Sequence, residues 1–159
     1  MMKSQWIMHS KIGSMYLVAS AEGLEGVFWK KQSAPVCKSL DSSQPEIKIL
    51  AKTVRQLEEY FEGKRTDFDL PLTPSGTDFQ KRVWAELSRI PYGKTLSYSD
   101  VARKIENEKA VRAVGTANGR NPLSIIVPCH RVIAADGTLG GYAGGLETKT
   151  TLLKLEQGN

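Results

Sequence analysis

The strongest constraint on the fold is an interruption near the middle of the chain, at residues 70–76, Leu-Pro-Leu-Thr-Pro-Ser-Gly. Two prolines and a glycine in so short a stretch end both helices and strands, because proline lacks a backbone donor and glycine favours turns. They interrupt the apolar patterns on both sides. We therefore expect two domains within the 159 residues, an N-terminal domain of residues 1–72 and a C-terminal domain of residues 76–159.

Two runs of β-forming residues open the N-terminal domain. Residues 15–19 and 24–29 are predicted strands, and the four residues between them are typical of a hairpin turn. Residues 43–46 have the spacing of a capping box with a proline inside it, so a helix should begin there. Apolar residues then recur at helical spacing, namely Ile47, Leu50, Val54, Leu57 and Phe61. This domain is predicted to be a small sheet with at least one helix.

Two further capping boxes organise the C-terminal domain. Residues 77–80 predict a helix that stops by residue 91, and residues 97–100 predict a second, short helix. A break at 106–108 precedes a third helix, over about 109–119. Two short helices across a tight break have the proportions of a helix-turn-helix, although a plain helical hairpin is commoner. The predicted fold class is therefore α/β (α+β), a small N-terminal sheet-and-helix domain followed by a mostly helical domain with a helix-turn-helix.

Composition and charge exclude several classes of protein. No apolar run approaches the ~20 residues that span a membrane, and the first ten residues lack the core of a signal peptide, so we expect a cytoplasmic protein. The two cysteines and two histidines lack the paired spacing of a zinc site. Residues 76–159 carry twelve Lys and Arg against eight Asp and Glu, whereas residues 1–75 carry ten against nine. This excess favours a polyanionic partner for the C-terminal half, although many basic chains bind no nucleic acid.

Reactive side chains follow residues 124–127, an apolar run that ends at Pro128. A thiol, an imidazole and a guanidinium come next, in Cys129, His130 and Arg131. Most lone cysteines are small buried hydrophobes, but a neighbouring imidazole can take the proton of a thiol and make it a nucleophile. Adjacent residues on a strand point to opposite faces, so this pair can cooperate only if the backbone turns after Pro128 or a water bridges the two groups.

A histidine that acts as a base needs a carboxylate or carbonyl on its second ring nitrogen. Glu156 is the candidate, because a carboxylate at the C-terminal end of a helix opposes the helix dipole and so suggests another role. A solvated terminal residue is the alternative. The helix that carries Glu156 is predicted to pack Leu146, Thr150 and Leu153 on one stripe, and residues 132–139, with a central Asp-Gly, are predicted to form a hairpin.

Three blocks of sequence carry a family resemblance. Residues 125–133 read Ile-Ile-Val-Pro-Cys-His-Arg-Val-Ile, residues 114–122 read Val-Gly-Thr-Ala-Asn-Gly-Arg-Asn-Pro, and residues 140–146 read Gly-Gly-Tyr-Ala-Gly-Gly-Leu. With these blocks in this order, the chain resembles the O6-alkylguanine-DNA alkyltransferases, which are single-use DNA repair proteins. The resemblance runs strongly from Phe79 to Glu156 and loosely through the N-terminal half. It implies irreversible, stoichiometric transfer of the alkyl group of O6-alkylguanine, and of O4-alkylthymine, from DNA to Cys129.

The resemblance also implies a catalytic role for each residue that matches the family pattern. Cys129 would be the nucleophile, His130 would act as a base through a water, and Glu156 would orient His130. Asn121 would brace the turn that holds the nucleophile, and Tyr98 would donate its hydroxyl to the guanine ring as negative charge develops there. The implied activity is that of a methylated-DNA–[protein]-cysteine S-methyltransferase that acts once, a suicide enzyme, because a thioether has no good leaving group.

Arg112 resembles the family's arginine finger, which fills the gap in the duplex after the damaged nucleotide is flipped out. Flipping has a chemical cause, because a stacked guanine hides its O6 from a thiol. The helix around Arg112 is rich in small residues and would lie in the minor groove; close packing against another helix is the alternative. The residues expected at the DNA are Arg112, Ala113, Gly115, Lys109, Ser97 and Arg120. Those expected in the guanine pocket are Val132, Gly140, Tyr142, Ala143 and Gly144, where Ala143 stands in place of a serine found in some relatives.

The implied partner is double-stranded DNA that carries O6-alkylguanine. No membrane, metal, cofactor or obligatory protein partner is implied, and we expect a monomer. Two alternatives remain open at this point. The first is a DNA-binding module that recognises lesions without removing them, which should tolerate Cys129→Ser. The second is a cysteine hydrolase that uses Cys129 and His130, which should turn over many times and ignore DNA.

Overall fold

The structure, a computed structural model, describes residues 2–158. The chain divides into two compact units, residues 1–75 and residues 76–159, each with its own core. Regular strands and one long helix make up the first unit, and short helices with a two-residue strand pair make up the second. This small N-terminal antiparallel sheet followed by helices confirms the predicted fold class.

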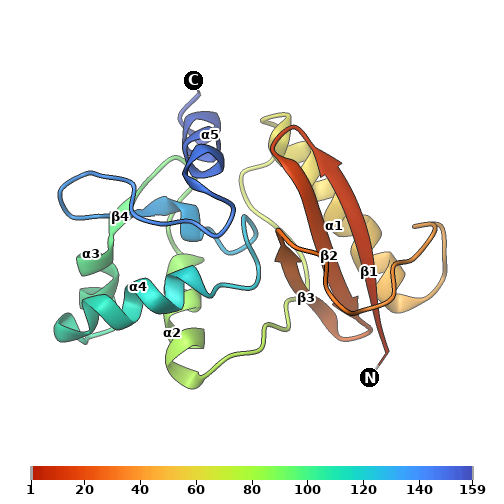
Figure 1. Ribbon diagram of the computed structural model, residues 1–159, viewed down its shortest axis with the longest axis horizontal. Coiled ribbons are helices and arrows are strands. Elements are labelled where there is room, and N and C mark those ends of the chain that lie inside the picture. Colours follow the sequence, from red (N-terminus) through yellow and green to blue (C-terminus); the bar gives the residue numbers. More distant parts are fainter. Residues whose placement is uncertain (1, 159) are drawn as a thin grey trace. The chain divides into compact units, whose positions relative to one another are not determined.

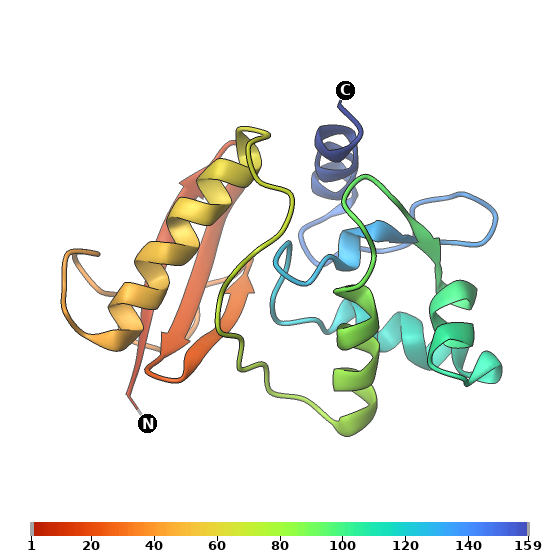
Figure 2. The ribbon, with the colours of Figure 1, turned by 180° about the vertical axis from the view of Figure 1, so that it is seen from behind.

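The first unit is a three-stranded antiparallel sheet covered by a helix. Strands β1 (Lys3–Ser10), β2 (Gly13–Ser20) and β3 (Gly23–Phe28) pair in the order β1-β2-β3, and α1 (Pro45–Phe61) lies along the sheet (Figures 1 and 2). The predicted hairpin is β2–β3, with Ser20 opposite Gly23. Strand β1 is an addition to the prediction, because its mixed polar sequence buries side chains only at irregular intervals.

Helix α1 begins differently from the prediction. Its N-cap is Gln44, Pro45 is at the first helical position, and no side chain caps the helix, so the capping box expected at Ser43 and Glu46 is not formed. Ile47, Leu50 and Leu57 are buried as expected, and Tyr60 joins them. Proline explains the start without a side-chain cap, because its fixed φ suits the first turn and its missing N–H needs no partner.

Both capping boxes predicted in the second unit are formed. Thr77 caps α2 (Asp78–Leu87), and Ser97 caps α3 (Tyr98–Lys104). A left-handed residue at Glu106, with φ of 59°, makes the expected break. A short 3-10 turn, η1 (Glu108–Ala110), then leads into α4 (Val111–Gly119), so the third predicted helix starts as a 3-10 turn.

Helices α2, α3 and α4 pack together in the second unit, and Trp84 Nε1 on α2 donates to the Ala117 carbonyl on α4 over 2.8 Å (Figure 1). This bond is buried and links the two helices. Helix α2 ends at Leu87, earlier than predicted, but Ile90 beyond its end is still buried.

Of the predicted hairpin over 132–139 only the turn forms, closed by the Ala134 amide, which donates to the Thr138 carbonyl over 2.9 Å. Strand β5 (Val132–Ile133) pairs in parallel with β4 (Leu96–Ser97), not with residues 138–139. A turn at Asp136–Gly137 does form, with the Gly137 amide donating to the Ala134 carbonyl over 3.0 Å. No second strand follows it, because the carbonyls of Val132 and Leu139 accept hydrogen bonds from the side chain of Lys149 on α5 (Leu146–Glu156) instead.

The predicted packing stripe of the last helix, α5 (Leu146–Glu156), is wrong. Leu146 is 52% exposed, and Thr150 and Leu153 are only partly buried. The buried residues of α5 are Lys149, Leu152 and Glu156. Two of these three are charged, so hydrophobic spacing could not identify the inner face.

Candidate active site

The residues from Asn121 to Val132 form one almost completely buried segment, which we call the acceptor segment. It does not form a strand. A 3-10 turn, η2 (Cys129–Arg131), follows Pro128, and the Arg131 amide donates to the Pro128 carbonyl over 3.0 Å. The backbone therefore turns at Pro128, as cooperation between Cys129 and His130 requires. Cys129 is 3% exposed and His130 is fully buried.

Asn121 holds the acceptor segment in shape from within. Its Nδ2 donates to the Val127 carbonyl over 2.9 Å, and its Oδ1 accepts from the Leu123 amide over 3.0 Å. Ile125, between these two bonds, has a φ of 72°, which is strained for a β-branched residue. The two side-chain bonds of Asn121 stabilise that conformation in place of strand pairing.

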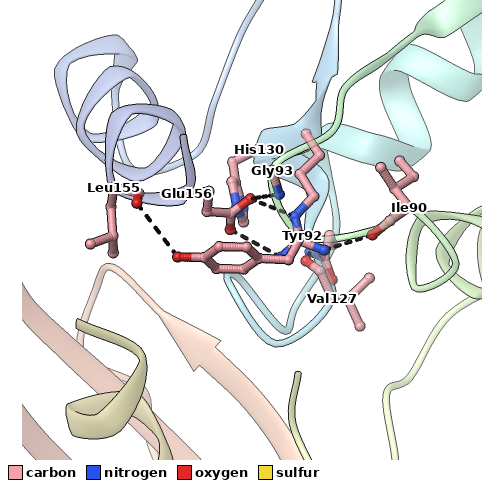
Figure 3. Close-up of polar contacts among 9 residues, drawn as sticks. Ile90, Tyr92, Gly93, Val127, His130, Leu155 and Glu156 are labelled. Carbon is pink, nitrogen blue, oxygen red and sulfur yellow. Dashed lines mark hydrogen bonds and ion pairs between the residues drawn. The ribbon is translucent and has the colours of Figure 1, made fainter. Parts of the chain in front are cut away.

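Glu156 lies against His130, although 26 residues separate them. Its Oε2 is 2.6 Å from His130 Nε2, and both side chains are buried (Figure 3). Glu156 also takes two bonds from the Arg131 guanidinium, at 2.7 and 3.0 Å, so it is a carboxylate and can only accept. His130 Nε2 is therefore the protonated ring nitrogen, and His130 Nδ1 has no hydrogen-bond partner among residues 2–158.

Burial raises the pKa of the Cys129 thiol to about 11. The Asn121 hydrogen bond and the positive charge of Lys149 oppose this rise. Burial also lowers the pKa of His130, and the charges of Arg131 and Lys149 add to that effect while Glu156 opposes it. At neutral pH the pair is thus a neutral thiol beside a neutral imidazole, with roughly one cysteine in ten thousand ionised. A thiol in this state needs a base when it reacts.

Tyr98, the first residue of α3, borders the same site. Burial raises the pKa of its hydroxyl, so the hydroxyl keeps its proton at neutral pH and can donate. Gly140 lies directly against it, with a φ of 71°, and a Cβ there would be 2.7 Å from the Tyr98 hydroxyl. Only glycine fits this position, because a side chain would need both a left-handed backbone and the space that Tyr98 occupies.

The other residues expected in the pocket differ in burial. Val132 is fully buried, Tyr142 and Gly144 are partly buried, and Ala143 is exposed. The rings of Tyr142 and His130 meet edge to face, with centroids 6.5 Å apart. Burial raises the pKa of the Tyr142 hydroxyl well above its ordinary value, so this group also stays neutral. The loop thus places one aromatic ring against His130 and exposes Ala143.

Helix α4 has two distinct faces. Arg112 and Ala113 are exposed, as are Lys109 before the helix and Arg120 at its C-cap. The opposite face buries Val114, Ala117 and Asn118, so small residues serve packing on one side and leave a slim surface on the other. Gly115 lies between the faces, where a Cβ would be 3.8 Å from the Tyr98 ring. The Ser97 hydroxyl caps α3 by accepting from the Asp100 amide over 3.0 Å.

Besides Arg131, two groups at this site were not among the predicted site residues. Lys149 is fully buried, and its ammonium donates to the carbonyls of Val132, Leu139 and Gly141. Asn118 Nδ2 donates to the Cys129 carbonyl over 3.4 Å. Lys149 lies seven residues before Glu156, on the same face of α5. The spacing puts the two residues on one face, but it does not show that this face is buried.

In the part of the chain that the structure describes, no group of three or more His, Cys, Asp or Glu side chains could hold a metal ion. No described helix is long and apolar enough to span a lipid bilayer.

Comparison with known proteins agrees with this geometry. Residues 78–158 match the DNA-binding domain of 6-O-methylguanine DNA methyltransferase, and residues 6–74 match the ribonuclease-like domain of the same proteins. The methylated-DNA–protein-cysteine methyltransferase of Methanosarcina barkeri is 48% identical over 153 residues, which cover 96% of each chain.

Solved structures extend the similarity to the fold. The O6-methylguanine methyltransferase of Mycobacterium tuberculosis superimposes with a TM-score of 0.86 at 40% identity, over 99% of this chain and 94% of that one. The structure of the Mycobacterium tuberculosis protein in complex with DNA also gives 0.86, at 42% identity over 98% and 93%. The chain therefore belongs to the 6-O-methylguanine DNA methyltransferase family.

Proposed function

We propose that this protein repairs alkylated DNA by moving the alkyl group of O6-alkylguanine onto its own Cys129. The observation that carries the proposal is the turn η2, in which the buried Cys129 thiol is followed by the buried imidazole of His130. That imidazole donates from Nε2 to Glu156 and has no partner on Nδ1 among the described residues. Its relative from Mycobacterium tuberculosis has been solved in complex with DNA, and the relative from Methanosarcina barkeri is named a methylated-DNA–protein-cysteine methyltransferase.

The proposed reaction is a displacement at carbon. The Cys129 sulfur forms a bond to the alkyl carbon as the bond from that carbon to guanine O6 breaks, and the bonding electrons leave with the guanine. The thiol proton passes through a water to His130 Nδ1, and the guanine takes up one proton as it departs. Tyr98 donates its hydroxyl hydrogen bond to the guanine ring as negative charge develops, which the raised pKa of that hydroxyl permits.

The alkylated cysteine is a thioether, so each protein molecule reacts once. Water does not displace a thiolate from carbon under mild conditions, so the Cys129 thiol is not regenerated. The expected stoichiometry is one alkyl group per chain.

We propose that the exposed face of α4 enters the minor groove. Arg112 would fill the gap left by the flipped nucleotide, and Ala113 and Gly115 would permit close approach to the duplex. Lys109, Arg120 and the region of Ser97 would contact the backbone of the DNA. The exposure of Arg112, Ala113, Lys109 and Arg120 supports this assignment.

The flipped base would lie between the acceptor segment and the loop that carries Gly140, Tyr142, Ala143 and Gly144. Main-chain carbonyls of Cys129 and Val132 would accept from the guanine amino group, and the Ala143 amide would donate to O6. O4-alkylthymine is a second proposed substrate, because its alkyl group is also on an exocyclic oxygen of a base. Monomeric state and cytoplasmic location stay predictions.

The proposal is tested by intact-protein mass spectrometry after incubation with a duplex that contains O6-methylguanine. We expect wild-type protein to gain the mass of one methylene, mapped to Cys129, and Cys129→Ser to gain none. Cys37→Ser is the matched control, because Cys37 is the other cysteine of the chain and should not affect the transfer. Binding to the lesion duplex without any gain in mass would contradict transfer and favour a damage-recognition module.

A further inference from the structure

Arg131 is a buried cation that has no role in the reaction proposed above. It is 5% exposed, and its guanidinium makes a forked pair with Glu156, from Nε to Oε1 over 2.7 Å and from Nη2 to Oε2 over 3.0 Å. Its Nη1 donates to the Ile90 carbonyl over 2.7 Å, and the cation lies 5.7 Å from the centre of the Tyr92 ring.

Glu156 is consequently saturated with donors. Its Oε1 accepts from Arg131 and, over 3.4 Å, from the Gly93 amide, and its Oε2 accepts from Arg131 and His130 (Figure 3). A forked guanidinium pair fixes the plane of a carboxylate as well as its position. The orientation of Oε2 towards His130 Nε2 therefore depends on Arg131.

The charges around His130 show what Arg131 does to the protonation of the imidazole. The ionisable groups that face the His130–Glu156 pair are Arg131, Lys149, Cys129, Tyr92 and Tyr142. Burial keeps the cysteine and both tyrosines neutral, and the Lys149 ammonium is bonded to three backbone carbonyls. Arg131 is thus the cation that neutralises Glu156 directly.

Without Arg131, the buried carboxylate would have to be neutralised by another group. His130 is the nearest one, since it already donates to Oε2 over 2.6 Å, and a buried carboxylate next to an imidazole favours the imidazolium. A protonated His130 has a proton on Nδ1 as well and cannot accept one from Cys129. The charge of Arg131 beside Glu156 therefore determines whether His130 Nδ1 can accept the Cys129 proton.

We propose that Arg131 is a positioning residue that neutralises and orients Glu156, so that His130 stays neutral with Nδ1 able to accept the Cys129 proton. This inference rests on the proposed alkyl transfer for its kinetic consequence, but its effect on His130 can be measured without any substrate.

The test follows the ring nitrogens of His130 by NMR across pH in wild type, Arg131→Met and Arg131→Lys. The chain has only two histidines, and His9, exposed on β1, serves as an internal reference. In wild type we expect His130 to stay neutral, protonated on Nε2, at pH 6. In Arg131→Met we expect it to be largely protonated at that pH. Arg131→Lys keeps the charge but loses the fork, and should restore the neutral state in large part.

The rate of reaction with free O6-benzylguanine gives the second readout. Because wild-type His130 is neutral at pH 6, a variant whose His130 pKa lies one unit above that pH keeps only about a tenth of its base. Arg131→Met should therefore lose roughly tenfold at pH 6 and much less at pH 8.5. An equal loss at every pH, with His130 still neutral, would overturn the proposal and leave Arg131 a structural residue.

A second comparison, of Glu156→Gln with the double variant Glu156→Gln/Arg131→Met, applies if Arg131→Met alone is too unstable to measure. Glu156→Gln removes the charge that Arg131 neutralises, so adding Arg131→Met to it should change neither the titration of His130 nor the remaining rate by more than about twofold. A further large loss in the double variant would mean that Arg131 acts outside Glu156 and would overturn the proposal. Absence of alkyl transfer in wild type, with the predicted titration of His130, would instead contradict the proposed function and leave the role of Arg131 intact.

Discussion

The two units of this chain bury different kinds of residues. The unit of residues 2–75 has strands of eight, eight and six residues and an apolar core, and Glu46, in the first turn of α1, is its one buried residue among Asp, Glu, His, Lys and Arg within the described part. The unit of residues 76–158 has strands of only two residues and buries His130, Arg131, Lys149 and Glu156.

Backbone hydrogen bonding explains the difference. Strand pairing satisfies the backbone of the first unit, so apolar side chains can fill the space between sheet and helix. The acceptor segment forms no such ladder before Val132, and several of its buried carbonyls accept from side chains, namely those of Asn118, Asn121 and Lys149. The irregular backbone that presents Cys129 is therefore tied to buried charge.

The largest contrast should come from Lys149→Met compared with Leu50→Ala, since both side chains are fully buried. Lys149→Met removes the side-chain donor of the Val132, Leu139 and Gly141 carbonyls. It should destabilise the fold by about 3 kcal/mol. It should also slow alkyl transfer ~100-fold, because the loop of residues 139–145 would be displaced. Leu50→Ala should cost about 2–5 kcal/mol in the first unit but leave the rate of the folded protein unchanged.

Urea denaturation and the rate with O6-benzylguanine measure the two effects. Lys154→Met, at an exposed position of the same helix, is the control and should change stability by less than about 0.5 kcal/mol. A Lys149→Met protein that keeps its full rate would show that buried charge in the second unit serves stability alone.

The two cysteines give the next contrast, because each unit contains one. Burial raises the pKa of both thiols, to about 11 at Cys129, whereas Cys37 is only partly buried. When the pH is raised, the absorbance of the Cys37 thiolate should therefore appear before that of the Cys129 thiolate. The variants Cys37→Ser and Cys129→Ser assign each step to its cysteine. At pH 7.5 iodoacetamide should modify Cys37 faster, while O6-benzylguanine modifies Cys129 alone.

If Cys129 reacts with O6-benzylguanine in spite of its raised pKa, the thiol is activated by His130 during the reaction. It is then not a thiolate before the substrate binds. Ionisation of Cys129 before Cys37 would contradict this account of the site.

Removing an exposed cationic side chain should have a moderate effect in the second unit and none in the first. Arg112→Ala should slow repair of an O6-methylguanine duplex about tenfold or more but leave the reaction with free O6-benzylguanine unchanged, because only the duplex requires flipping. Lys48→Ala, at an exposed position of α1, should affect neither reaction. Rates on both substrates for both variants complete the comparison. Equal losses on the two substrates with Arg112→Ala would contradict the flipping role.

The helix caps should give the smallest effect. Thr77 Oγ1 accepts from the Gln80 amide over 3.1 Å, so Thr77→Ala should destabilise the protein by about 1 kcal/mol. Ser43→Ala should cost less than about 0.5 kcal/mol, because Ser43 does not cap α1. Urea denaturation of the two variants side by side measures the difference. A large cost for Ser43→Ala would show that α1 begins as the sequence pattern predicted.

Local patterns predicted much of this molecule. The hairpin of β2 and β3, the capping boxes of α2 and α3 and the break before α4 all depend on residues within a few positions of one another, and each is present. The turn after Pro128 was also predictable, because proline at the end of an apolar run cannot continue a strand. Glu156 was identified as the partner of His130 from its unfavourable place at a helix end, and the two side chains do meet.

The sequence by itself thus determined most of the helices, the β2–β3 hairpin and the candidate reactive residues Cys129, His130 and Glu156. Only the tertiary structure decided that β5 pairs with β4, that Lys149 and Glu156 are on the buried face of α5, and that Arg131 lies against Glu156. The physical reason is that a local pattern registers hydrophobicity and backbone preference, whereas the burial of a charge depends on partners brought from distant parts of the chain. A lysine that donates to three carbonyls has the same local sequence signature as one in solvent.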